Sequence, residues 1–190
     1  MRTMFLKKES AWKFVTSSTG GVGAEFVAAE GGKLYFQDPQ GKDVTFVYGA
    51  AGVGYSVGLK LPKIGKLEVK VKGKSVFGAI APAAFPNAGK LYIADTFSGN
   101  ELSQNDIRGV CVFLEVAGGL VAGVSATAML VGISPVWLAG LSLAPVGGPL
   151  AMAYLDYKMI EAATGLLVMA GVNVGLTAGG GIGAFIGGLY

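Results

Sequence analysis

The sequence predicts an α+β protein in which an antiparallel β-meander precedes an apolar, glycine-rich region with helical character. Three observations support this prediction: charge gathers in the first half, specific turn residues separate β-type runs, and glycine recurs at every fourth position near the C-terminal end. We divide the 190 residues into a lead-in at 1–22, a soluble β-rich unit at 23–108 and an apolar, membrane-active region at 109–190.

Charge is distributed unevenly along the chain. Residues 1–108 hold fourteen of the fifteen Lys and Arg residues and nine of the twelve acidic residues, a net charge of +5. Residues 109–190 carry a net charge of −2. Charged residues make up 14 % of the chain, and 32 residues are glycine. High hydrophobicity with little charge argues against disorder, and abundant glycine indicates close backbone packing.

Residues 23–97 contain alternating runs separated by turn residues. Gly31-Gly32 lies between two such runs, and paired glycines favour a two-residue hairpin turn. Asp38-Pro39-Gln40-Gly41 has proline and glycine at the positions that β-turns prefer. These patterns predict an antiparallel unit with turns at Gly31-Gly32 and at Pro39–Gly41.

A lysine-rich run follows, in which Leu67, Val69 and Val71 alternate with polar residues. A strand with one face in water accounts for this alternation, and lysines on an edge strand discourage unwanted pairing. Alternatively, the lysines contact anionic lipid headgroups. Nucleic-acid binding is disfavoured because the run lacks arginine and interleaved aromatic residues. The candidate lipid-contacting residues are Lys60, Lys63, Lys70, Lys72 and Lys74.

The apolar region is predicted to be helical. A capping-box pattern at Ser98–Glu101 indicates a helix start, and the run from Gly109 to Ile133 is long enough to cross a bilayer. The run at 162–190 has no charge. Glycines at every fourth position let two membrane helices approach closely. These helix-packing glycines are Gly171, Gly175, Gly179, Gly183 and Gly187.

An all-β barrel is the alternative fold. A period of four is also a multiple of two, so the same glycines fall on one face of an extended strand. Residues 120–130 alternate in a similar way, and glycine disfavours a helix in water by about 1 kcal/mol.

The acidic residues of the apolar region are candidate pore or intramembrane charges, because ionisable groups in apolar segments face a polar interior or a partner. These residues are Glu115, Asp156 and Glu161. For residues 156–161 a solvated loop is the alternative, in which Glu161 pairs with Lys158 at i, i+3.

Enzymatic residue patterns are missing from the sequence. The chain has no histidine, which removes the commonest general base and metal ligand, and its one cysteine, Cys111, lies in an apolar run. Gly73-Lys74-Ser75 lacks the earlier glycine of a phosphate-binding loop. We therefore expect no enzyme activity, no catalytic residues, no metal and no cofactor. The N-terminus also lacks the apolar stretch of a Sec signal peptide.

A basic β portion, no Sec signal and glycine-zipper spacing together resemble the small pore-forming bacterial effectors exported by type VI secretion. The resemblance implies a toxin that depolarises a target membrane after delivery into another cell. It also implies self-association in the lipid membrane and a partner that acts as an immunity protein or chaperone. The alternative function is that of a non-enzymatic lipid-binding or assembly protein built on a glycine-rich β barrel or sandwich.

Overall fold

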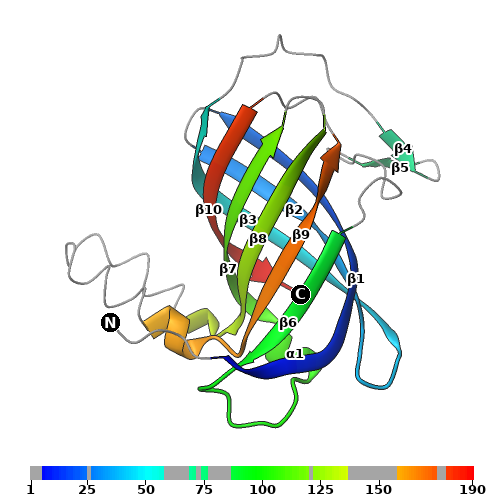
Figure 1. Cartoon of the computed structure of the whole chain (residues 1–190), viewed down its shortest axis with the longest axis vertical. Coiled ribbons are helices and arrows are strands. Elements are labelled where there is room, and N and C mark those ends of the chain that lie inside the picture. Colours follow the sequence, from blue (N-terminus) through cyan, green and yellow to red (C-terminus); the bar gives the residue numbers. More distant parts are fainter. Residues whose placement is uncertain are drawn as a thin grey trace.

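The computed structural model describes residues 6–24, 27–57, 69–71, 74–76, 87–119, 122–136, 158–174 and 179–190. In these residues eight strands form a closed antiparallel barrel, and β4 and β5 form a separate two-stranded sheet (Figure 1). The barrel strands are β1 (Leu6–Ala24), β2 (Val27–Gln37), β3 (Asp43–Val57), β6 (Asn87–Ala94), β7 (Gly109–Gly119), β8 (Ala122–Ile133), β9 (Gly165–Val174) and β10 (Gly179–Leu189). The separate sheet consists of β4 (Val69–Val71) and β5 (Lys74–Val76).

The strand order around the barrel is β1-β2-β3-β10-β7-β8-β9-β6. Two meanders of consecutive strands, β1–β3 and β7–β9, are joined by β10 on one side and by β6 on the other. β10 pairs with β3 from Gly180↔Val57 to Leu189↔Tyr48, and with β7 along its whole length. Strands from both halves of the sequence therefore share one barrel.

The predicted α+β class is wrong, and the all-β barrel alternative is confirmed. Residues predicted as membrane helices form β7, β8, β9 and β10. The described helical segments are α1 (Gln104–Ile107) and short helical turns at 135–136 and 158–162. The error has a physical cause: an even period satisfies both the helical and the extended interpretation. In the closed barrel, ladders on both sides of each glycine-rich strand supply the backbone hydrogen bonds that a helix makes internally.

One predicted turn is confirmed and the other is wrong. The β2–β3 hairpin turns through Asp38–Lys42, where Gly41 has a φ of 83° and the Asp38 carboxylate accepts from the Gln40 and Lys42 N–H groups. Gly31 and Gly32 instead lie within β2, opposite Gly49 and Tyr48 of β3. A Cβ at Gly31 would lie 3.1 Å from the Tyr48 carbonyl oxygen, so this glycine allows close strand packing.

The helix predicted from Ser98 begins five residues later. Ser103 is the N-cap of α1, its side chain accepts from the Asp106 N–H, and the Asp106 carboxylate accepts in return from the Ser103 N–H at 2.8 Å. The capping box is therefore formed by Ser103 and Asp106 instead of the predicted Ser98 and Glu101.

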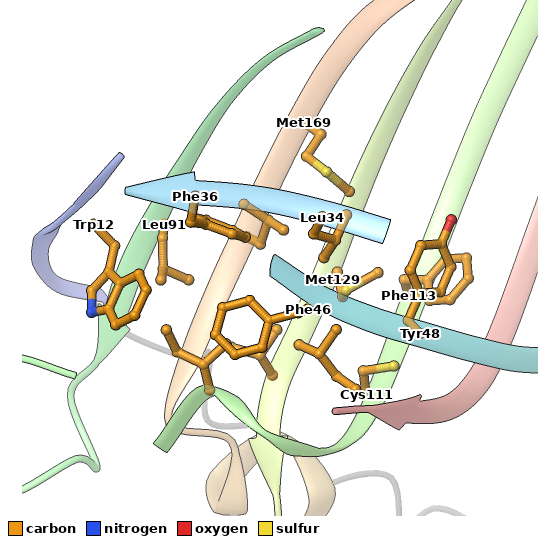
Figure 2. Close-up of a cluster of buried hydrophobic side chains, with 14 of the residues drawn as sticks. Trp12, Leu34, Phe36, Phe46, Tyr48, Leu91, Cys111, Phe113, Met129 and Met169 are labelled. Atoms are coloured by element: carbon orange, nitrogen blue, oxygen red, sulfur yellow. The ribbon is translucent and has the colours of Figure 1, made fainter. Parts of the chain in front are cut away.

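Inward-facing side chains fill one end of the barrel, as the close-up in Figure 2 shows. This end lies near α1, at the lower end of the barrel in Figure 1. Phe36 meets Phe46 edge to face with ring centroids 5.7 Å apart, and Phe113 stacks on Phe185 at 4.8 Å. The buried cluster contains Trp12, Leu34, Phe36, Phe46, Tyr48, Leu91, Ile93, Leu102, Ile107, Cys111, Phe113, Met129, Val131, Leu167, Met169, Phe185 and Leu189. The larger of two buried hydrophobic clusters in the described residues therefore fills the lumen, and the smaller one contains Val110, Ile133, Met159 and Ala163.

Candidate functional site

The outer faces of β7, β8, β9 and β10 form a continuous surface without charge at the described outward positions. The register aligns Ala184, Leu114, Ala128 and Val168 in one row across the four strands. Leu114 is 55 % exposed, Val116 52 % and Val168 40 %. We call this surface the apolar wall. Its residues are Val112, Leu114, Val116, Ala126, Ala128, Leu130, Leu166, Val168, Ala170, Ala184, Ile186 and Gly188.

Charged side chains gather on the remaining strands, towards the end of the barrel that holds α1. Val168 of the apolar wall is opposite Lys90 of β6, and the Lys90 ammonium lies 2.8 Å from the Glu9 carboxylate of β1. We call this set the charged rim. Its members are exposed: Lys7, Lys8, Glu9, Lys13, Lys33, Lys42, Asp43 and Lys90. The outside of the barrel is therefore divided into an apolar part and a charged part.

The lumen changes in character along the barrel axis. Above the stacked Phe113 and Phe185, the next inward position of β7 is Glu115, which is half-buried and paired in register with Gly183 and Thr127. Large apolar residues thus fill one end, and the next described inward positions of β7 and β8, Glu115 and Thr127, are polar.

The connection between β6 and β7 closes the filled end. Leu102 and Ile107 of this connection are buried in the core, and the Trp12 indole N–H donates to the Leu102 carbonyl oxygen at 2.7 Å. The Glu101 carboxylate accepts from the Ser10 hydroxyl at 2.5 Å and from the Ala11 N–H at 2.9 Å. The start of β1 is thereby tied to the segment that covers the barrel mouth.

These contacts set the pKa of Glu101. Burial acts to raise it, but hydrogen bonds from Ser10, Ala11 and Leu102 and the charge of Lys8 act in the opposite direction. The net result is a Glu101 pKa below its ordinary value, so the carboxylate stays ionised at neutral pH.

The predicted helix-packing glycines lie on strands. Gly171 belongs to β9, and Gly179, Gly183 and Gly187 belong to β10, so they do not form a helical stripe. A Cβ at Gly187 would collide with backbone atoms of Gly49 and Ala50 on β3. At Gly187 the glycine therefore allows close contact between β10 and β3. Gly175 lies outside the described residues.

Among the predicted charged residues, Glu115 lies inside the barrel and Glu161 lies on a short helical turn. The Glu161 carboxylate is 2.7 Å from the Lys158 ammonium, which confirms the predicted i, i+3 pair. The short helix at 158–162 packs Met159 against Val110 and Ile133. Lys70 and Lys74 belong to β4 and β5. Asp156, Lys60, Lys63 and Lys72 lie outside the described residues.

The sequence interpretation missed the contribution of β1, which occupies most of the segment taken as a lead-in. Its Trp12 and Ser10 hold the mouth closure. A local signal was present, since Ser10, Trp12 and Phe14 alternate with exposed positions. Glu101 has no such local signal, because its role depends on a contact with Ala11, which is 90 residues away in the sequence.

Among the residues that the structure describes, no three His, Cys, Asp or Glu side chains are arranged to hold a metal ion. No described helix combines the length and the apolar character needed to cross a membrane.

Fold and surface together define a small closed β-barrel with a packed lower lumen, an apolar outer wall and a charged rim. Comparison with known proteins shows that the chain is 42 % identical over 185 residues to "Toxin protein Tse4" of Pseudomonas aeruginosa, covering 96 % of this chain and 94 % of the relative. The chain belongs to the family of this toxin. No protein-family model matches the chain, and no solved structure matches it. The predicted toxin class is thus confirmed.

Proposed function

We propose that this toxin inserts its β-barrel into a target membrane and permeabilises it, so that the membrane depolarises. In this proposal the lipid bilayer is the target and no enzymatic step is involved. The toxin is delivered to the target cell by secretion. A dedicated immunity protein or chaperone in the producing cell protects that cell.

The apolar wall carries this proposal. Strands β7, β8, β9 and β10 have 11, 12, 10 and 11 residues, and membrane-spanning strands need about 9–11 residues. The described outward positions hold aliphatic residues and one glycine, which suit lipid, whereas a water-exposed sheet alternates apolar with polar residues. A contiguous surface of this kind marks a membrane or an interaction surface.

The lumen favours membrane permeation over the storage of a lipid. Phe36 packs against Phe46, and Phe113 packs against Phe185, where an acyl chain would have to lie. Glu115 of β7 and Thr127 of β8 lie on the inward faces of strands whose described outward residues are apolar. Polar residues that face the interior of a barrel with an apolar exterior are typical of membrane barrels.

The test is a lysine substitution in the apolar wall. Val116→Lys should reduce vesicle binding and dye release by roughly tenfold or more, because a lysine facing lipid at the bilayer midplane costs about 2–4 kcal/mol. Val47→Lys is the matched control, since Val47 is 49 % exposed and pairs in register with Lys33 of the charged rim.

Circular dichroism and thermal unfolding in the absence of vesicles should show that both variants fold. Normal release with Val47→Lys and lost release with Val116→Lys support the proposal. Equal release by the two variants contradicts it, and so does a wild-type protein that binds no vesicles.

A further inference from the structure

An eight-stranded barrel is too narrow to conduct while its own side chains fill it. Barrels of this size have interiors that side chains fill, and wide aqueous channels occur in barrels with many more strands. Here the lower lumen is packed with aromatic and aliphatic residues, and the β6–β7 connection covers its end. Permeation, on which the following inference rests, therefore requires the barrel to rearrange.

The seam between β1 and β6 is the least regular in the described barrel. Its register comprises four residue pairs and shifts twice, whereas β10 pairs without a shift to both β3 and β7. Glu9 is opposite Tyr92, and Lys13 is opposite Lys90. Three residues of β1 thus lie between these pairs, but Leu91 alone lies between them on β6. The additional β1 residues bulge away from the ladder.

Side chains accept hydrogen bonds from β1 N–H groups where the backbone ladder is irregular. The Ala11 N–H donates to Glu101 at 2.9 Å, and the Trp12 N–H donates to the Ser10 hydroxyl oxygen at 3.2 Å. Outside the barrel, Lys90 pairs with Glu9 across the seam, and both side chains are more than half exposed. Exposed ion pairs of this kind contribute little stability.

We propose that the barrel opens along the β1–β6 seam, and that the freed β1 edge of one copy pairs with the freed β6 edge of the next copy. Repetition of this contact builds a ring with more strands and a wider lumen. The partner is thus a second copy of this chain.

The two freed edges are suited to each other. They already pair antiparallel within one chain, so the same ladder and the same Glu9–Lys90 attraction form again between copies. An unpaired strand edge also recruits another strand readily. Because β1 meets β6 and not another β1, the contact is heterologous and closes into a ring when the rotation permits.

A disulfide across the seam tests the opening. Glu9 and Tyr92 are directly opposite, and opposed residues of antiparallel strands have a Cα separation that a disulfide spans. Oxidised Glu9→Cys/Tyr92→Cys should bind vesicles like the wild type but release dye at least about tenfold more slowly, because the bond removes the open state. Reduction should restore release. The native Cys111 is fully buried and stays free.

The matched control is Tyr35→Cys/Thr45→Cys, an opposed pair on the regular β2–β3 seam. Oxidation of this control should leave release unchanged. If the oxidised Glu9→Cys/Tyr92→Cys protein binds vesicles and releases dye at the control rate, the seam does not open. If the wild type neither binds nor releases, membrane permeation itself is refuted, which separates the two failures.

A second measurement does not depend on the double variant folding. The single variants Glu9→Cys and Tyr92→Cys, mixed on vesicles and oxidised, should give a disulfide-linked dimer that contains one of each. The same mixture without vesicles should give little of it. A mixture that permeabilises vesicles without forming this mixed dimer overturns the proposed contact between copies.

Discussion

At the scale of single residues, the glycines serve strand contact. Gly187 faces the β3 backbone, and a Cβ there would collide with the Gly49 carbonyl oxygen and the Ala50 Cα. Gly49 itself has nothing within 4 Å of the position a Cβ would take. Two glycines in neighbouring strands thus differ in whether they have room for a side chain. Their spacing in the sequence does not reveal this difference.

Gly187→Ala should destabilise the barrel by about 1–3 kcal/mol, the cost typical of overpacking a well-packed site. Gly49→Ala should change the free energy of unfolding little, since alanine meets no atom there and also restricts the unfolded chain. Denaturant titration of the two variants checks the difference. Equal losses of stability would show that β3 and β10 are farther apart than described.

At the scale of elements, the sequence predicts the β2–β3 hairpin but not the pairing of the other barrel strands. The β2–β3 hairpin was foreseen because Asp38–Gly41 carries its own turn chemistry. β9 and β10 were taken for helix because a period of four fits both structures. What decides between them is pairing with β3, β6, β7 and β8, and no local pattern reports such pairing.

The connection between β6 and β7 should loosen in acid. The Glu101 pKa is lower in the folded protein than in the unfolded chain, so its stabilising contribution is complete above the ordinary pKa and is lost as the pH falls through the folded value. Its ordinary value is 4.5, so the loss begins below about pH 4.5. Denaturant midpoints between pH 6 and pH 3 should show it.

Glu101→Gln is the control for this pH dependence. It removes the charge, so it should lower stability at pH 6 and flatten the dependence between pH 4.5 and pH 3. Asp43→Asn, on the exposed β2–β3 hairpin, should leave the slope nearly intact. A slope that persists in Glu101→Gln would assign the acid sensitivity to other carboxyl groups.

At the scale of the whole molecule, the outer surface combines an apolar wall with a charged rim. The composition of the two halves anticipated this division, but not its geometry. β10, from the apolar half, pairs with β3 from the charged half, so the two surfaces belong to one barrel. A charge within an apolar run predicts that Glu115 faces an interior, but the helical interpretation does not predict its register neighbours Gly183 and Thr127.

Binding to anionic vesicles should weaken as salt is raised, because exposed charges are screened beyond about 10 Å at 0.1 M ionic strength. The lysines of the charged rim contribute to this attraction to anionic lipid. The sequence predicts a further contribution from Lys60, Lys63, Lys70, Lys72 and Lys74. Binding to neutral vesicles should change little, since it depends on the apolar wall. Sedimentation with both vesicle types from 50 mM to 500 mM salt measures this. Equal binding under all conditions leaves the lysines without a role in lipid contact.

The position of β10 between β3 and β7 has a kinetic consequence. The hairpins β1–β2, β2–β3 and β7–β8 close loops of two, five and two residues, whereas 31 residues separate β8 from β9. Gly180 must find Val57, and loop-closure entropy makes contacts between residues so far apart in the sequence slow to form. Insertion of β10 is therefore expected to be a late step of folding. Until it occurs, β3 and β7 present unpaired edges, to which the proposed chaperone would bind before the barrel closes.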